Sequence, residues 1–253
     1  LHNLAFTHER RAGQRERRSG GMRVHALDRV QRNAHHSRAR QLYWEALEIR
    51  VGVLGEGHMD TAATMFNLGL SLRNTVMFGR ALWRRQALRE APLVLAKRLL
   101  EATLGAWREH LRVRQKKSSP SASASASAAV AAGSGPGAGA GGGGADKEVS
   151  MDIEDVAACL QYLATVEVEL EHYARALELF EQQVEIYTLC FEHKGKFTLA
   201  RNAGLDVTAK IGLRGEALAG AALCLVRLGR LPDAIERYKV ARKVLRSSFV
   251  LSS

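Results

Sequence analysis

Residues 215–248, GEALAGAALCLVRLGRLPDAIERYKVARKVLRSS, contain two helical patterns separated by a turn. In the first pattern apolar residues recur at intervals of three and four, which marks one face of a helix: Leu218, Ala221, Ala222, Leu225 and Leu228. Gly229 and Arg230 interrupt it, and a second face follows at Leu231, Ala234, Ile235, Tyr238 and Ala241. Small residues such as Ala222 and Ala234 let two antiparallel helices approach closely. The stretch therefore predicts a helix–turn–helix pair.

Similar pairs occur upstream in the chain. LGRLPDAIERY at 228–238 aligns with LEHYARALELF at 170–180 after a shift of 58 residues. DVAACLQYLA at 155–164 aligns with DTAATMFNLG at 60–69 after a shift of 95 residues, and ARQLYWEALEI at 39–49 has the same spacing of small and aromatic residues. Self-similarity of this kind predicts a repeat architecture in which neighbouring helix pairs stack.

A low-complexity segment divides the repeats. Residues 118–145 contain only Ser, Ala, Gly and Pro apart from Val130, so they cannot bury enough apolar surface to offset the entropy of ordering. We expect four parts: a basic, disordered tail at 1–35, helical repeats at 36–117, a disordered linker at 118–150 and further helical repeats at 151–248.

The composition and the charge distribution bear on which partners and which compartment we expect for the protein. The net charge of +11 is concentrated in residues 1–40, with ten arginines and three acidic residues, and in residues 80–117, with eleven basic and three acidic residues. No apolar run is long enough to span a membrane. The single cysteines Cys159, Cys190 and Cys224 are typical of buried thiols in a reducing compartment, so we expect a cytoplasmic location, with the nucleus as second choice. The start at Leu1 rather than Met suggests a partial gene model or a fragment.

The stretch ALEIRVGVLGEGHMDTA at 46–62 has a glycine spacing that suggests a phosphate loop or half of a metal site. It lacks the preceding strand and the G-K-[ST] ending of a phosphate loop, so we interpret it as a turn between helices, with Asp60 and Asp155 as helix N-caps. His35 and His36 have no further ligand at metal spacing. The acidic residues in 146–192 are scattered around the helix surfaces, so we expect their side chains to face solvent. We expect no catalytic residue, cofactor or metal.

The pattern of small and large residues over 215–248 resembles the tetratricopeptide repeat. Residues 46–74 are similar to the longer repeat of kinesin light chains, with its A-L-E-I-R, L-G-x-x-H-P-D and N-L-A/G motifs, although Met59 replaces the proline. The resemblance implies an all-α fold of stacked antiparallel helix pairs, a solenoid interrupted by the disordered low-complexity insertion. It also implies a non-enzymatic adaptor or scaffold that binds a peptide or helix of a protein partner, often an acidic one, in a concave groove.

The repeat register places the groove on the first helix of each pair. The predicted groove residues are Phe66, Asn67, Leu70, Arg73, Asn74, Gln161, Tyr162, Thr165, Glu169 and Arg227. Amide side chains suit recognition of an extended backbone, and an arginine suits a carboxylate.

Two alternatives stay open. The basic residues of 1–40 could bind nucleic acid, although the tail has no interleaved aromatic residues. The repeats could also regulate a larger enzyme or signalling protein. In 93–114, Leu93, Leu100, Leu104, Trp107 and Leu111 follow one helical stripe with Arg98, Arg108 and Arg112 outside it. We expect this stripe to pack against a neighbouring repeat, the alternative being a membrane or a partner groove.

Overall fold

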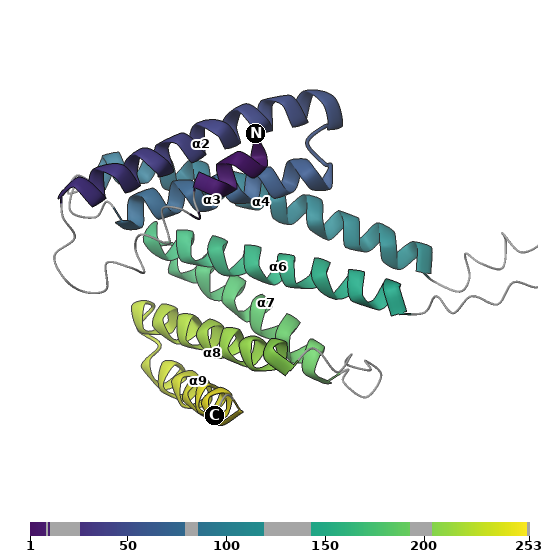
Figure 1. The fold of residues 1–253 in the computed structure, drawn as a ribbon. Coiled ribbons are helices and arrows are strands. Elements are labelled where there is room, and N and C mark those ends of the chain that lie inside the picture. The colour runs from purple at the N-terminus through teal and green to yellow at the C-terminus, as the bar shows by residue number, and fades with distance from the viewer. Residues whose placement is uncertain (9, 11–25, 79–85, 119–142, 193–203, 252–253) are drawn as a thin grey trace, which may run out of the picture. The chain divides into compact units, whose positions relative to one another are not determined.

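The computed structural model describes residues 1–8, 10, 26–78, 86–118, 143–192 and 204–251. All regular secondary structure in these residues is α-helical, which confirms the all-α class for this part of the chain. A short helix covers residues 2–8. The longer helices are α2 (Ala26–Leu54), α3 (Met59–Phe78), α4 (Gln86–Ser118), α6 (Gly143–Glu169), α7 (Tyr173–Glu192), α8 (Gly204–Arg227) and α9 (Leu231–Leu251), as Figure 1 shows.

The helices group into two compact units. Unit 1 comprises Leu1–Ala106 and Tyr162–His172, and unit 2 comprises Trp107–Gln161 and Tyr173–Ser253. The division passes through α4 and α6. The units therefore do not coincide with the two repeat segments expected on either side of the linker.

Helices occur within both segments that were expected to be disordered, the tail at 1–35 and the linker at 118–150. In the tail, the short helix at 2–8 contradicts the expected disorder. α2 begins at Ala26, inside the tail expected at 1–35. α6 begins at Gly143, so residues 143–150 at the end of the expected linker are helical. The helix begins within the Gly/Ala run, which ends at Ala145, and the residues that follow the run include good helix formers such as Lys147 and Glu148. Residues 119–142 of the linker lie outside the described residues.

The turns after α6 and α8 have the same backbone geometry 58 residues apart. Glu171 and Gly229 both adopt a positive φ, of 64° and 77°. In each turn the next amide donates to the carbonyl five residues earlier, at 2.9 Å in both cases. This pattern is the Schellman motif, which satisfies the last carbonyls of a helix and reverses the chain. The sequence repeat is thus also a repeat of local structure.

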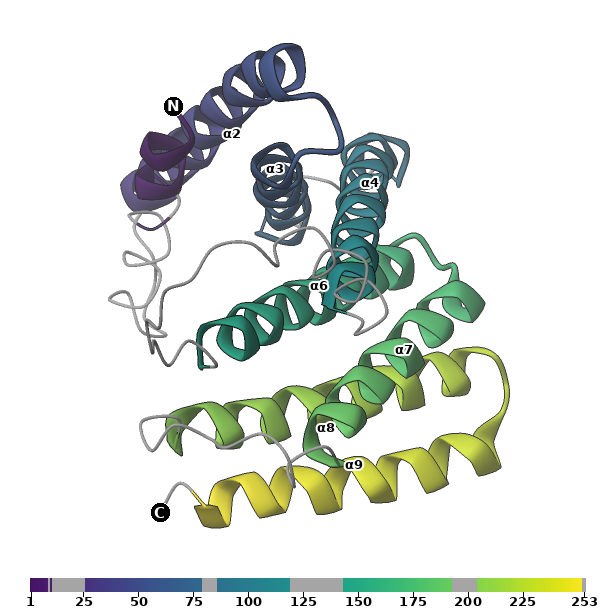
Figure 2. The same cartoon turned by 90° about the vertical axis from the view of Figure 1, so that its right-hand side faces the viewer.

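In unit 2, α7, α8 and α9 lie side by side in both views (Figures 1 and 2). α8 and α9 form a hairpin around Gly229, and Ala222 is buried in α8 as expected. The contact between α7 and α8 is closest at Gly220, where an added Cβ would lie 2.6 Å from Cζ of Phe180. The ring of Phe180 therefore fills the space that a larger residue at position 220 would need.

In unit 1, α3 packs against α4 at a glycine that leaves space for a large side chain of the other helix. A Cβ added at Gly69 would lie 3.1 Å from Cγ of Leu100, and Thr103 Oγ1 donates to the Ala62 carbonyl at 3.2 Å. The apolar stripe of α4 is buried at Leu93, Leu100, Leu104 and Trp107, whereas Arg98, Arg108 and Arg112 are exposed. The expectation that this stripe serves packing is confirmed.

Three local expectations were wrong. From its lack of a backbone N–H we expect Pro92 to separate the stripe at 93–114 from the preceding helix, but it lies inside α4, which begins at Gln86. Asp60 is not an N-cap: the ring Nδ1 of His58 accepts from the Asp60 amide at 3.1 Å, so the histidine provides the acceptor at the start of α3. Asp155 lies in the interior of α6, because that helix begins earlier than expected.

Glu167 contradicts the expectation that acidic side chains of the second repeat segment are solvated. Its side chain is fully buried in unit 1, with Oε1 2.8 Å from Lys97 Nζ and Oε2 2.8 Å from His172 Nδ1. The repeat register aligns this position with Leu72 and Leu225, so a carboxylate here replaces an apolar core residue. Burying a carboxylate costs several kcal/mol unless a cation compensates for it. Lys97 provides that compensation, and the His172 ring adds a hydrogen bond.

We predict that Gly220→Ala destabilises the protein by about 1–2 kcal/mol, because the new methyl group displaces the buried Phe180 ring. Gly212→Ala is the matched control in the same helix, since nothing lies within 4 Å of its Cβ position. The control should gain about 0.5–1 kcal/mol from higher helix propensity. Urea denaturation measures both changes, and equal stabilisation by the two substitutions would contradict the close packing at Gly220.

We also predict that Lys97→Ala lowers the free energy of unfolding by about 2 kcal/mol or more, because it removes the cation from a buried carboxylate. The double variant Lys97→Ala with Glu167→Leu should recover most of the loss, since leucine occupies the aligned positions. Thermal or urea unfolding of the single and double variants tests this. If the double variant is no more stable than Lys97→Ala, the loss of stability in the single variant does not come from the unpaired Glu167 carboxylate.

Candidate functional site

The predicted groove residues are divided between the two units. In unit 1, α3 and the C-terminal part of α6 carry eight of the ten, which we call the α3–α6 surface: Phe66, Asn67, Leu70, Arg73, Asn74, Tyr162, Thr165 and Glu169. Gln161 and Arg227 belong to unit 2. Most of the predicted groove residues therefore lie on the α3–α6 surface of unit 1.

Three residues of this surface form a cluster across the two helices. The rings of Phe66 and Tyr162 meet edge to face, with centroids 5.7 Å apart and planes at 66°. The Arg73 guanidinium lies over the Tyr162 ring, with Cζ 5.6 Å from the centroid. Edge-to-face aromatic pairs and cation–π contacts both stabilise such an arrangement. Residues predicted from two separate repeats are thus in direct contact, and we call them the Arg73–Tyr162 cluster.

Arg73 forms no ion pair with an acidic side chain among the described residues. Its Nη1 donates to Asn74 Oδ1 at 3.2 Å, and its buried Nε has no hydrogen-bond partner among the described residues. Burial lowers the pKa of the guanidinium from its ordinary value, while Tyr162 opposes that shift. Arginine nevertheless keeps its charge in proteins. A half-buried guanidinium that no acidic side chain of the described residues neutralises is suited to bind a carboxylate from outside.

Asn67 has a neighbour that the sequence did not predict. Its Nδ2 lies 3.4 Å from His2 Nε2, and Thr64 Oγ1 lies 3.3 Å from Nδ1 of the same ring. The His2 ring also packs at an angle on Tyr43, with centroids 5.5 Å apart. Burial, followed by the positive charge of Arg50, lowers the pKa of His2. The short helix at 2–8 therefore lies against one end of the α3–α6 surface.

The remaining residues of the surface are partly accessible. Leu70, Asn74, Thr165 and Glu169 are all half-buried. Thr165 Oγ1 donates to the Tyr162 carbonyl at 2.8 Å, so this hydroxyl satisfies its own helix. Thr165 therefore offers a ligand mainly its partly exposed methyl group.

In unit 2 the two predicted residues have separate neighbours. Gln161 Nε2 donates to Glu216 Oε2 on α8 at 3.3 Å, and the Arg227 guanidinium lies 5.9 Å from the Tyr173 ring centroid. The structure also exposes Leu223 and Val226 on the same helix. We did not predict these two residues, although the shift of 58 residues aligns Leu223 with Thr165 and would have identified it.

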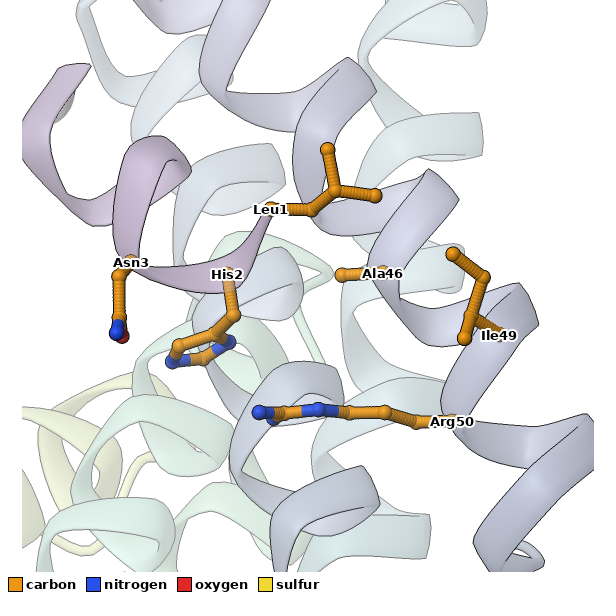
Figure 3. Close-up of a pocket in the computed structure, with 6 residues that line it drawn as sticks. All are labelled: Leu1, His2, Asn3, Ala46, Ile49 and Arg50. Atoms are coloured by element: carbon orange, nitrogen blue, oxygen red, sulfur yellow. The ribbon is translucent and has the colours of Figure 1, made fainter.

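A pocket of about 260 Å³ lies beside the α3–α6 surface, between the short helix at 2–8 and α2; it is lined by Leu1, His2, Asn3, Ala46, Ile49 and Arg50. His2 and Arg50 extend toward each other from these two helices (Figure 3). Arg50 Nη1 donates to the Asp60 carbonyl at 2.7 Å and to Thr64 Oγ1 at 2.6 Å. Its charge is therefore engaged in holding the α2–α3 connection, and we assign no ligand to the pocket.

Cysteine and metal chemistry have little support in the described residues. No group of three or more His, Cys, Asp or Glu side chains there could hold a metal ion. Cys159 and Cys224 are buried thiols outside any disulfide, as expected, and burial raises their pKa values to about 12 and about 11. The reactive thiolate is therefore scarce at neutral pH. The side chain of Cys190 lies outside the described residues.

We predict that an alkylating reagent at pH 8 modifies Cys159 and Cys224 slowly in the folded protein and rapidly after denaturation in urea. The raised pKa values keep both thiols protonated, and burial blocks access. Peptide mass spectrometry distinguishes these two residues from Cys190. Rapid native labelling of Cys159, the thiol with the higher pKa, would contradict its burial.

None of the described helices is long and apolar enough to cross a membrane. No family model matches the sequence, and no curated protein sequence matches it either.

Proposed function

We propose that the protein is a non-enzymatic interaction protein of the tetratricopeptide-repeat type. In this proposal it binds an extended, acidic segment of a protein partner on the α3–α6 surface. The observation that carries the proposal is Arg73, whose half-buried guanidinium has an unpartnered Nε and lies over Tyr162. Such a cation recognises a carboxylate, and the neighbouring rings offer apolar contact area.

Three further observations support the repeat assignment. The resemblance to the tetratricopeptide and kinesin light chain repeats covers 46–74 and 215–248. The two Schellman turns occur at aligned residues, Glu171 and Gly229. Small residues occur at aligned or neighbouring positions of the first helices, as Gly69 and Ala222 illustrate. Stacked helix pairs with this register present their first helices to an extended ligand.

Recognition on this surface would combine two kinds of contact. The segment's carboxylate would accept hydrogen bonds from Arg73, where partial burial strengthens a charge-assisted bond. Apolar side chains of the same segment would pack on Phe66, Leu70 and Tyr162. We propose a cytoplasmic location, because an adaptor of this kind meets its protein partners there.

The test uses a displayed library of random peptides selected on the immobilised full chain. We expect the selected peptides to be enriched in Asp and Glu. Arg73→Glu should weaken their binding by about tenfold or more, because it replaces the attracting cation with a like charge. Fluorescence anisotropy with a labelled selected peptide measures the change in Kd.

Arg98→Glu is the matched control, because it makes the same charge change at an exposed position of α4 in unit 1. It should leave the peptide Kd within about twofold. A small long-range electrostatic contribution can remain, and added salt screens it. Tyr162→Ala should weaken binding without changing the net charge. If Arg98→Glu weakens binding as much as Arg73→Glu does, the binding follows total charge and the proposed site is wrong.

A further inference from the structure

An exposed stripe of side chains runs along α9 in unit 2. Leu231, Ile235 and Tyr238 are 55%, 58% and 61% exposed, and Arg242 and Arg246 are exposed as well. The successive intervals of four, three, four and four residues place all five on one face of the helix. We call these five residues the α9 stripe. Its first half is therefore apolar and its second half is cationic.

The cationic half of the stripe has no acidic partner within the described residues. The ion pairs of α9 involve Asp233, Glu236 and Arg237, or their partners, and lie nearer the start of the helix. Arg242 and Arg246 take part in none of them. Two exposed guanidinium groups about one helical turn apart therefore give this end of the stripe a positive potential that attracts carboxylates.

The preceding helix pair shows how such a stripe is covered when it carries no charge. The shift of 58 residues aligns the α9 stripe with these residues of α7: Tyr173, Leu177, Phe180, Val184 and Thr188. α8 packs on α7 with Gly220 against the Phe180 ring, and Leu177 and Phe180 are only 7% and 5% exposed. On α9, arginines replace Val184 and Thr188. An apolar helix face there would bury two guanidinium groups without a partner, which costs free energy.

The same charge pattern does not suit a second copy of α9. If two α9 helices packed antiparallel along the whole stripe, Leu231 of one copy would meet Arg246 of the other, and Ile235 would meet Arg242. Parallel packing would bring arginine against arginine, and like charges across an interface repel. The covering element must instead carry acidic side chains opposite the two arginines and apolar side chains opposite the first half of the stripe.

The order of the two halves also favours a partner helix over a membrane surface. A helix that lies on a bilayer has apolar residues along its whole buried face and cations on the opposite, polar face. On α9 the arginines share one face with Leu231, Ile235 and Tyr238 and follow them along the helix. A uniformly apolar layer therefore matches only the first half of the stripe, whereas a partner helix can match both halves.

We propose that the α9 stripe binds an amphipathic helix of a protein partner, whose contact face is acidic in one half and apolar in the other. The acidic half pairs with Arg242 and Arg246, and the apolar half buries Leu231, Ile235 and Tyr238. From residue 231 to residue 246 the stripe spans about 22 Å, so a partner helix of about four turns covers it. The site lies within unit 2 and does not depend on the peptide-binding proposal for the α3–α6 surface.

The test begins with a displayed library of helical peptides in which only the positions of one face are randomised. The library is selected on the full chain carrying Arg73→Glu, which removes the attracting cation of the α3–α6 surface. We expect selected peptides to carry Asp or Glu in one half of the face and Leu, Ile or Phe in the other. Selected peptides without this division would overturn the proposal.

Fluorescence anisotropy of a labelled selected peptide then measures the contribution of each half of the stripe. Arg242→Glu together with Arg246→Glu should weaken binding by about tenfold or more, because like charges then face the acidic half of the peptide. Ile235→Ser should weaken binding by about tenfold, because it removes apolar burial from the other half. The wild-type chain and Arg73→Glu should bind the peptide with Kd values within about twofold, whether or not the α3–α6 surface binds peptides.

The matched control is Arg112→Glu together with Arg175→Glu, which makes the same charge change at exposed positions of α4 and α7 in unit 2. It should leave the Kd within about threefold, and circular dichroism confirms that each variant is folded. If this control weakens binding as much as the change at Arg242 and Arg246 does, the binding follows net charge and the proposal is overturned. Full binding by Ile235→Ser would overturn it too, because the arginines alone would then bind any polyanion.

Cosedimentation with vesicles that contain about 30% phosphatidylserine tests the membrane alternative. We expect the wild-type chain and Ile235→Ser to sediment with the vesicles to the same extent. Sedimentation that is abolished both by Ile235→Ser and by the change at Arg242 and Arg246 would assign the α9 stripe to a lipid surface and overturn the proposal.

Discussion

Two helix–helix contacts among the described residues depend on a glycine in one of the two helices. Gly69 lets α3 approach Leu100 of α4, and Gly220 lets α8 approach Phe180 of α7. At each contact the large residue of one helix enters the space left by the glycine of the other, so packing density is kept without a cavity. The spacing of the helices determines which of their remaining faces stay accessible. The α3–α6 surface and the α9 stripe are faces that this packing leaves at least partly uncovered within their own units.

The features that could be predicted from the sequence are those that depend on local spacing. The helical class, the turn at Gly229, the burial of Ala222 and the packing role of the stripe in α4 all follow from periodicity, which needs no knowledge of distant neighbours. The internal repeat adds long-range information, because aligned residues have similar surroundings. It placed Phe66, Arg73 and Tyr162 on one surface, although it did not predict the ring geometry or the cation–π contact.

The features that were missed depend on residues distant in the sequence. Glu167 has a spacing that fits a solvated acid, and its burial becomes understandable only with Lys97 and His172 beside it. A charged residue at a position that is Leu72 and Leu225 in the other copies was the available signal. The contact of His2 with Asn67 joins residues 65 apart in the chain. Pro92 was misjudged because a proline in a helix interior often kinks the helix rather than ending it.

The two surfaces differ in the chemistry that they can recognise. The Arg73–Tyr162 cluster contains a half-buried cation, so its selectivity comes from the cost of leaving that charge unpaired, and a neutral ligand does not remove this cost. The α9 stripe has exposed arginines at one end, so it gains free energy mainly from burying its apolar end and uses the arginines to orient the partner helix. A segment that offers Arg73 a carboxylate but has no apolar helix face is therefore poorly suited to the α9 stripe.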